Sequence, residues 1–199
     1  YGVKCYDCLT GFKYIAKIIR EKEGVEQYIG GGEESFGFLA GDFVRDKDGI
    51  SACSLAAEAA AWAKSKGLSL YSWLKEMYVK FGFYKEGLVN VVRKGKEGQE
   101  EIARMMTEYR ANPPKSILGS PVVLINDFQS LVQTDLRTGK TSPIVQDRSN
   151  VLQFFTEEGT KVSVRPSGTE PKIKIYYTTV GATNEEAAAL QKKYAEAFT

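Results

Sequence analysis

The sequence predicts an α/β region with a partial parallel βαβ unit, followed by an α+β region with an antiparallel sheet and flanking helices. Three observations predict this fold class. A strand–helix–strand pattern leads into three glycines at 30–32, short apolar strands fill the second half, and a capped helix closes the sequence. Because the pattern changes near residue 82, we expect one domain over residues 1–82 and another over residues 83–199.

The first region reads as a strand, a helix and a second strand. Residues 3–9 and 25–30 have the apolar character of strands, and between them Phe12, Ile15 and Ile19 recur at helical spacing. This order predicts a parallel βαβ unit, in which the helix crosses between two neighbouring strands.

Two helices complete the first region. Ser51 is expected to cap an alanine-rich helix over residues 52–66, which Gly67 closes. A further helix begins after Ser69 and ends near Gly82. Its apolar residues share one face and are Leu70, Trp73, Leu74 and Met77.

The second region predicts a sheet with two helices. The helices cover residues 97–110 and the segment after Thr183, where Glu186 completes a capping box. The expected strands are residues 88–92, 122–125, 131–135, 151–156, 161–165 and 173–178. Turn residues between short strands favour antiparallel pairing.

Charge and length exclude several classes of protein. The 199 residues include 27 Lys and Arg and 25 Asp and Glu, a net charge of +2. This balance does not favour nucleic-acid or membrane-surface binding by bulk charge. No apolar run approaches the length of a membrane span, and the start is not a signal peptide. Because the sequence does not begin with Met, we expect part of a longer protein.

The sequence contains no histidine, which excludes a Ser-His-Asp triad and a His-ligated zinc within this chain. The three cysteines indicate reduced thiols in a cytoplasmic protein. Cys5 and Cys8 have C-x-x-C spacing, but no second pair accompanies them, so we do not interpret them as a redox or zinc site. Residues 46–49 begin like a calcium loop without its later acidic ligands, and we interpret them as a turn.

A glycine-bounded polar loop at residues 32–37 is the first candidate site. Glu33 and Ser35 lie two residues apart after a predicted strand. A carboxylate accepts hydrogen bonds from sugar hydroxyls, and these bonds are stronger than neutral ones. The alternative interpretation is an ordinary polar turn.

The second candidate site is the loop at residues 165–171. Arg165 can bind phosphate oxygens bidentately, while Ser167 and Thr169 add hydroxyl donors. Gly168 allows successive N–H groups to converge on an anion. An exposed hairpin turn is the alternative. A third and weaker signal is Thr10 and Lys13 beside a helix start, where the alternative is a solvated lysine.

Three motifs in this order resemble the phosphoglucomutase/phosphomannomutase family, the α-D-phosphohexomutases. They are Thr-Gly-Phe-Lys at 10–13, Gly-Gly-Glu-Glu-Ser-Phe-Gly at 31–37 and Arg-Pro-Ser-Gly-Thr-Glu-Pro-Lys at 165–172. The resemblance covers essentially the whole chain. It implies a C-terminal fragment of a four-domain protein, in which residues 1–82 form most of domain three and residues 83–199 form domain four.

The resemblance also implies the roles of individual residues. Some relatives carry histidine where Phe12 stands, so no role is transferred to Phe12. The implied substrate-binding residues are Glu33, Ser35, Thr10 and Lys13, and the implied phosphate-binding residues are Arg165, Ser167, Gly168 and Thr169. No catalytic or metal residue of the family is implied for this fragment.

The implied reaction interconverts hexose 1-phosphate and hexose 6-phosphate through a phosphoserine and a bisphosphate. This makes the parent an isomerase of the intramolecular phosphotransferase type. Glucose is the favoured hexose, with mannose as the alternative. The resemblance implies Mg²⁺ bound by domain two and glucose 1,6-bisphosphate as activator of the parent. Because the phosphoserine and Asp-Gly-Asp-x-Asp-Arg motifs are absent here, the fragment alone is expected to be inactive.

Two other classes of function stay open. One is a stand-alone phosphosugar-binding module without catalysis. The other is an interaction domain that uses the antiparallel sheet, although a net charge of +2 argues against nucleic acid as its partner. On the leading interpretation the partners are a hexose phosphate and domains one and two of the parent chain, with neither nucleic acid nor membrane.

Overall fold

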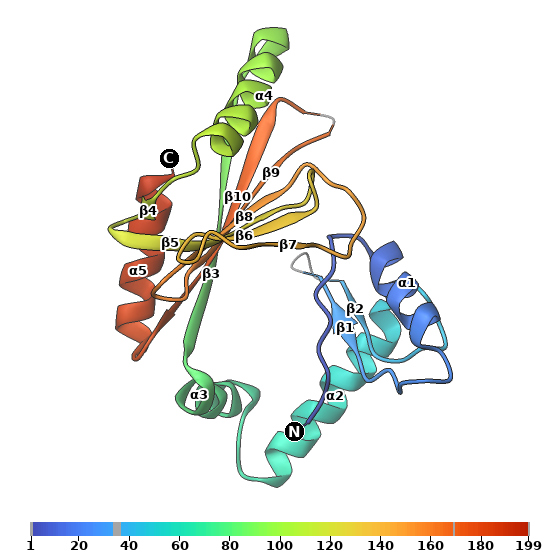
Figure 1. The fold of residues 1–199 in the computed structure, drawn as a ribbon. Coiled ribbons are helices and arrows are strands. Elements are labelled where there is room, and N and C mark those ends of the chain that lie inside the picture. Colours follow the sequence, from blue (N-terminus) through green and yellow to red (C-terminus); the bar gives the residue numbers. More distant parts are fainter. Residues whose placement is uncertain (1, 34–36, 169, 199) are drawn as a thin grey trace. The chain divides into compact units, whose positions relative to one another are not determined.

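The computed structural model describes residues 2–33, 37–168 and 170–198 (Figure 1). The chain divides into two compact units, Tyr1–Glu76 and Met77–Thr199, which we call the first and the second unit.

Helices dominate the first unit. The elements are α1 (Phe12–Lys22), β1 (Gly31–Gly32), β2 (Phe38–Leu39), α2 (Gly49–Ser65) and α3 (Leu70–Phe81), the last of which continues past the division. β1 and β2 form a small antiparallel pair. The core of the first unit is a cluster of Phe12, Ile19 and Leu39, against which Ile15 and Tyr28 pack.

The two segments expected as parallel strands, residues 3–9 and 25–30, are not strands in the described structure. A strand exists through backbone hydrogen bonds to a neighbour, and apolar character alone supplies none. Side chains connect the two segments instead. Lys4 Nζ lies 3.0 Å from a Glu26 carboxylate oxygen, and the Tyr6 hydroxyl donates to the same carboxylate at 2.8 Å.

Asp48, and not Ser51 as expected, is the N-cap of α2. The Asp48 carboxylate accepts hydrogen bonds from the backbone N–H groups of Ile50 and Ser51 at 3.1 and 3.3 Å. The helix therefore begins three residues earlier than the alanine-rich run suggested. Of residues 46–49, which were interpreted as a turn, Asp48 is this cap and Gly49 is the first residue of α2.

The second unit contains one large antiparallel sheet, with the strand order β3-β10-β9-β8-β5-β6-β7 and β4 paired to β5, eight strands among the described residues. Its strands are β3 (Phe83–Val92), β4 (Ser116–Ile117), β5 (Ser120–Asp127), β6 (Val132–Asp135), β7 (Thr141–Pro143), β8 (Leu152–Thr156), β9 (Lys161–Pro166) and β10 (Lys172–Gly181). The expected fold class, helices with a large antiparallel sheet, is confirmed.

Both helices of the second unit, α4 (Gly95–Ala111) and α5 (Asn184–Ala197), contribute to the core on one face of the sheet. Figure 1 shows α5 alongside β3 and β10. Met106 of α4 and Tyr194 of α5 pack with Val162, Ile173 and Tyr177 of the sheet. Within the described residues, α4 and α5 therefore leave the opposite face of the sheet uncovered.

The capping box predicted for the last helix is confirmed in modified form. The Thr183 hydroxyl accepts from the Glu186 backbone N–H at 3.1 Å. The Glu186 carboxylate reaches back one residue further than expected and accepts from the Ala182 N–H at 2.8 Å. None of the helices in the described ranges combines the length and the apolar character needed to cross a bilayer.

Candidate functional site

Of the phosphate-binding residues predicted from the sequence, Arg165 lies at the end of β9, and Ser167 and Gly168 lie in the loop between β9 and β10. The Ser167 N–H donates to the Lys172 carbonyl at 2.9 Å, and the Glu170 N–H donates to the Ser167 hydroxyl oxygen at 3.3 Å. Gly168 is exposed at the tip. Thr169 lies outside the described residues. Two adjacent strands thus present a short loop whose ends are closed by backbone hydrogen bonds.

Arg165 and Lys174 form a cross-strand pair of like charge at this loop. They are directly opposite each other in the β9–β10 register, and both side chains are half-buried. Neither forms an ion pair with another described residue. Like charges directly opposite in a sheet are destabilising, whereas an anion between them would turn repulsion into attraction. Lys174 was missed in the sequence, because only strand pairing places it beside Arg165.

Lys172 is already neutralised within the loop. Its ammonium group pairs with the Glu170 carboxylate. A hydrogen bond from Lys172 and its charge, together with the charge of Lys174, hold the pKa of Glu170 below its usual range. The cations left for a ligand at this loop are therefore Arg165 and Lys174.

The candidate sugar loop is held closed by the β1–β2 pair. The Glu33 N–H donates to the Gly37 carbonyl at 2.9 Å. Ser35 lies outside the described residues, as do its two neighbours. A Cβ atom on Gly37 would stand 2.5 Å from the Phe12 ring and 3.2 Å from a Glu33 carboxylate oxygen. Only glycine lets the ring and the carboxylate approach the backbone this closely.

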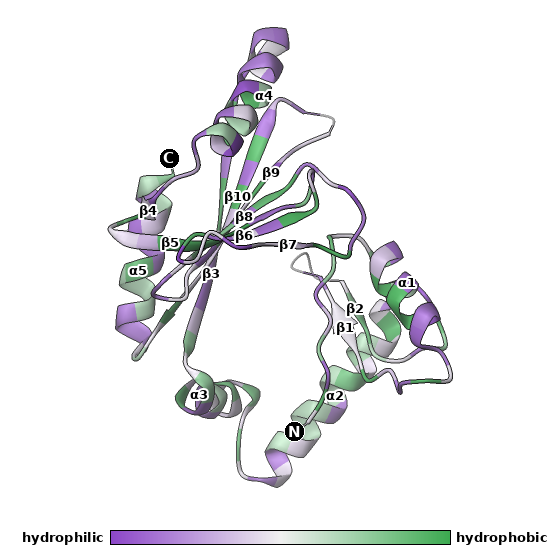
Figure 2. Ribbon diagram, viewed as in Figure 1, coloured by the Kyte–Doolittle hydropathy of each residue, from purple (hydrophilic) through white to green (hydrophobic). Residues whose placement is uncertain are grey.

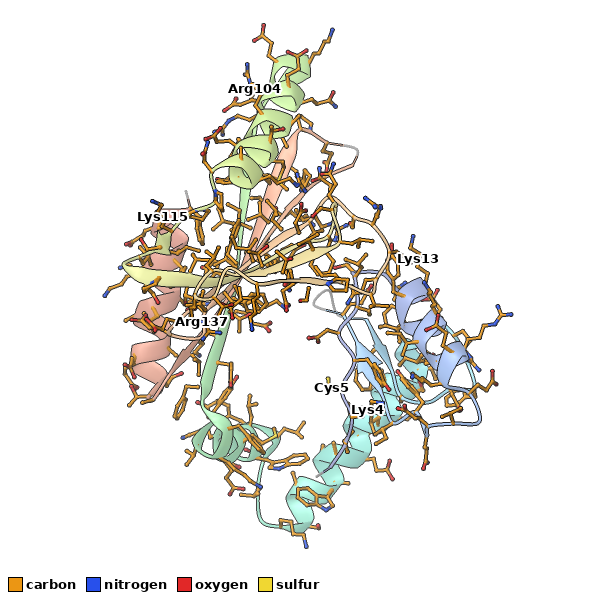
Figure 3. The ribbon with its side chains drawn as sticks, in the orientation of Figure 1. Lys4, Cys5, Lys13, Arg104, Lys115 and Arg137 are labelled. Carbon is orange, nitrogen blue, oxygen red and sulfur yellow. The ribbon has the colours of Figure 1, made fainter. Side chains whose placement is uncertain are left out.

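This contact brings the first two sequence motifs together. Phe12 is the first residue of α1 and is buried, so its ring is part of the core and not a ligand-facing group. The exposed residues Thr10 and Lys13 flank it, and Lys13 Nζ lies 4.8 Å from the centre of the Tyr14 ring. Figure 3 shows Lys13 projecting from α1. Thr10, Lys13 and Glu33 therefore lie on segments that meet at Phe12.

Cys8, which the sequence analysis considered only for its C-x-x-C spacing with Cys5, is close enough to this loop for the charge of Glu33 to act on it. Burial, followed by the charges of Asp7 and Glu33, raises the pKa of the Cys8 thiol. A raised pKa keeps the thiol protonated and poorly nucleophilic. Cys5, Cys8 and Cys53 are all free thiols.

The described residues do not provide a magnesium site. Among them, no group of three or more His, Cys, Asp or Glu side chains is placed to hold a metal ion. Mg²⁺ needs several oxygen ligands in near-octahedral geometry. The described residues thus do not fit a resident Mg²⁺.

Two family models match the chain. The phosphoglucomutase/phosphomannomutase α/β/α domain III matches residues 1–81, and the C-terminal domain of the same family matches residues 88–197. The chain belongs to the phosphoglucomutase/phosphomannomutase family. The family expected from the three motifs is thereby confirmed.

Curated relatives carry the name phosphoglucomutase. One from Staphylococcus epidermidis is 39% identical over 176 residues, which is 88% of this chain and 32% of that protein. One from Staphylococcus aureus is 39% identical over 175 residues, with the same shares covered. The chain thus spans about a third of the length of these relatives.

A solved structure shares the fold. It is the open form of parafusin from Paramecium, titled a phosphoglucomutase, with a TM-score of 0.60 and 18% sequence identity. The match covers 94% of this chain and 32% of the Paramecium chain. At this identity the likeness supports the fold, while the family rests on the sequence matches.

Proposed function

We propose that this chain is the C-terminal part of a phosphohexomutase that interconverts hexose 1-phosphate and hexose 6-phosphate. Residues 1–82 supply the sugar-binding loop and residues 83–199 supply the phosphate-binding loop. The relatives' shared name and the order of the motifs favour glucose as the hexose. Mannose differs from glucose in the configuration at carbon 2, so residues that bind the hydroxyls at other carbons can bind either sugar.

The chemistry divides between this chain and the rest of the parent. In the proposed reaction a phosphoserine of the parent gives its phosphoryl group to the free hydroxyl of a hexose monophosphate. The bond from phosphorus to the serine oxygen breaks, a bond to the sugar oxygen forms, and the proton of the sugar hydroxyl passes to the serine oxygen. The resulting bisphosphate, which is also the activator of the parent, turns over and returns its other phosphoryl group to the serine.

The task proposed for this chain is to hold the substrate while phosphoryl transfer proceeds elsewhere. Arg165, Ser167, Gly168 and Thr169 grip the phosphate that does not react. The Glu33 carboxylate accepts a hydrogen bond from a sugar hydroxyl, and the Ser35 hydroxyl donates one to a second sugar hydroxyl. Thr10 and Lys13 contribute to binding of the same substrate. Domains one and two of the parent chain supply the phosphoserine and the Mg²⁺. We assign the parent to the cytoplasm.

A single observation carries the proposal, namely the unpaired cations Arg165 and Lys174 directly opposite each other beside the loop. Two half-buried like charges directly opposite each other on adjacent strands are destabilising, and neither forms an ion pair with another described residue. A phosphate dianion supplies the missing charge. The planar Arg165 guanidinium can bind two of its oxygens at once.

Calorimetric titration with glucose 1-phosphate and glucose 1,6-bisphosphate tests the proposal. Arg165→Ala is expected to weaken binding by tenfold or more, since a charge-assisted bidentate contact is lost. Arg104→Ala is the matched control. Arg104 is exposed on α4, away from the loop (Figure 3), so its loss removes the same charge without the contact.

The two outcomes lead to different conclusions. Binding that Arg165→Ala abolishes and Arg104→Ala spares would establish the phosphate site in this chain. Equal effects of the two variants would reduce the interaction to general charge attraction and contradict the proposal. In the parent protein the same Arg165→Ala change must lower mutase activity, whereas a stand-alone binding module would bind without any mutase activity.

A further inference from the structure

A row of side chains, all polar except Leu88, crosses the face of the second unit's sheet opposite α4 and α5. The register places one residue of each strand directly opposite the next, from β3 to β7: Leu88, Tyr176, Ser163, Gln153, Asn126, Gln133 and Ser142. Directly opposite residues share a face of a sheet. Their strand neighbours Val162 and Phe154 belong to the core under the helices, so the row lies on the other face.

Three side chains of this row, Gln133, Asn126 and Gln153, form what we call the amide row. Gln133 Nε2 donates to Asn126 Oδ1 at 2.9 Å, and Asn126 Nδ2 donates to Gln153 Oε1 at 3.2 Å. The Ser142 hydroxyl donates to Gln133 Oε1 at 3.3 Å and begins the series. Every hydrogen bond therefore runs in the same direction, from β7 toward β8.

The direction of these hydrogen bonds determines which atom of Gln153, the last amide of the series, remains available to a ligand. Gln153 accepts with Oε1, so its Nε2 group is the end of the series. Among the described residues this Nε2 has no hydrogen-bond acceptor. Gln153 is half-buried and its Nε2 is not a buried atom, so this donor is open to water or to a ligand oxygen.

The unused donor lies beside the phosphate site. Ser163 of β9 is directly opposite Gln153, and Arg165 is two residues further along β9 on the same face. Diagonal neighbours of this kind are about 7–8 Å apart, within reach of long side chains. A ligand oxygen bound by Arg165 is therefore accessible to the Gln153 amide.

We propose that Gln153 is a further ligand-contacting residue, whose Nε2 donates a hydrogen bond to the phosphosugar held at Arg165. Asn126 and Gln133 are positioning residues that keep the donor end of Gln153 toward the ligand. This inference rests on the proposed function and adds a neutral donor to the two cations. A neutral donor selects an oxygen by position without increasing the local positive charge.

Because the hydrogen bonds of the amide row all run in one direction, a substitution on β5 that touches no ligand can test the proposal. Asp at position 126 can only accept hydrogen bonds. In Asn126→Asp, Gln153 must donate to position 126, which turns its Oε1 toward the ligand. An acceptor then faces the ligand oxygens, so binding is expected to weaken although the substituted residue lies on β5 and touches no ligand.

The experiment uses the ¹⁵N-labelled 199-residue chain, titrated with inorganic phosphate and with glucose 6-phosphate. The side-chain amide resonances of Gln153 are expected to shift and to saturate with the same Kd as the backbone signals of the loop. Gln153→Met, similar in size but without a donor, is expected to weaken binding about tenfold. Asn126→Asp is expected to weaken binding at least as much.

Gln129→Glu serves as the charge control for Asn126→Asp. It adds one negative charge in the exposed turn after β5, outside the row, and is expected to leave Kd unchanged. Loss of affinity for both ligands in Gln153→Met would place the contact on the phosphate. Loss for glucose 6-phosphate alone would place it on a sugar hydroxyl. Both results support the proposal.

The results that overturn the inference are distinct from those that overturn the proposed function. Unmoved Gln153 resonances in the wild-type chain, with Arg165→Ala still abolishing binding, would overturn the inference alone. An Asn126→Asp effect matched by Gln129→Glu would reduce the positioning role to charge. If Arg165→Ala left binding unchanged, the phosphate site itself would be wrong, and the inference would fail with it.

Discussion

The two units differ in how much of their apolar surface they cover by themselves. The second unit buries a continuous cluster that includes Phe154, Ile173 and Tyr194. The first unit buries a cluster of Phe12, Ile19 and Leu39. Its α2 helix is green along most of its length in Figure 2, yet Ile50 is 83% exposed and Trp62 is 48% exposed.

This difference teaches that apolar composition does not by itself produce a core. In the second unit, strict alternation along β8, β9 and β10 sends every second side chain to the face covered by α4 and α5. In α2, apolar residues surround the helix, a pattern of helices covered on several sides. The described contacts of the first unit do not provide that cover, so its stability should respond weakly to loss of single apolar side chains.

The largest expected effect is Phe154→Ala in the second unit, which should lower the free energy of unfolding by about 3–5 kcal/mol because Phe154 is 2% exposed. Trp62→Ala should cost less than about 1.5 kcal/mol, since it removes a half-exposed ring packed on Trp73. Urea unfolding measures both. Both tryptophans lie in the first unit, so their fluorescence reports that unit, and far-UV circular dichroism follows the sheet. Equal losses would contradict the difference between the units.

The next effect concerns a close approach in the sheet. Tyr177 lies directly opposite Gly87, and a Cβ on Gly87 would stand 2.1 Å from the Tyr177 ring. Tyr177 cannot yield, because it is buried against Tyr194 and donates to the Gln191 carbonyl at 3.1 Å. Gly87→Ala should therefore cost about 1–3 kcal/mol.

Gly49→Ala is the control for this change. Gly49 begins α2 in the first unit, and a Cβ there would meet nothing within 4 Å. Alanine is the better helix former, so this variant should be neutral or more stable. A loss at Gly49 as large as at Gly87 would show that the steric argument for the sheet is wrong.

A smaller gain is expected at the turn between β4 and β5. Leu118 has φ 50° and Gly119 has φ 87°, the paired positive values of a hairpin turn that favours Asn-Gly. Leu118 is exposed, so Leu118→Asn should relieve strain and stabilise the second unit by about 0.5–1 kcal/mol. Leu136→Asn, at an equally exposed leucine without a positive φ, should give no gain in the same unfolding experiment.

The smallest effect is a pH dependence of the first unit. The hydrogen bonds with Ser51 and with the Ile50 N–H hold the pKa of Asp48 below its usual value. A lowered folded-state pKa means that the cap stabilises the helix above the unfolded pKa of about 3.9 and loses its effect as pH falls through the folded value. Acid titration of the Ile50 amide resonance should show this loss below about pH 4.

Asp48→Asn keeps a capping oxygen but cannot ionise, so its Ile50 amide should not titrate in that range. If the variant titrates like the wild type, the pH dependence belongs to another carboxylate.

The elements that could be predicted from the sequence are those specified by a local signal. Helical spacing at Phe12 and Ile19, and the capping box at Thr183, each specify structure within a few residues. The strands expected at 3–9 and 25–30 are not strands, and the short strands β1, β2, β4 and β7 were missed. Strand formation depends on a partner elsewhere in the chain, and no local pattern states whether that partner is present.

The candidate site divides in the same way. Arg165, Ser167 and Gly168 stand together in one motif, so the sequence could indicate a phosphate loop directly. Lys174 and Gln153 could not be found by this means. They join Arg165 only through the pairing of β8, β9 and β10, and neither residue type is unusual in a strand.

The sequence by itself determined the family, the positions of the helices and the residues of the two loops. Glycines, prolines, helix caps and motif residues influence the structure within a few positions, so their effects can be predicted from the sequence. The tertiary structure alone decided that Phe12 lies against Gly37, that Arg165 and Lys174 oppose each other, and that the amides of the row share one direction. These relations join segments far apart in the chain, and only the register of the sheet and the packing of the core bring them within contact distance.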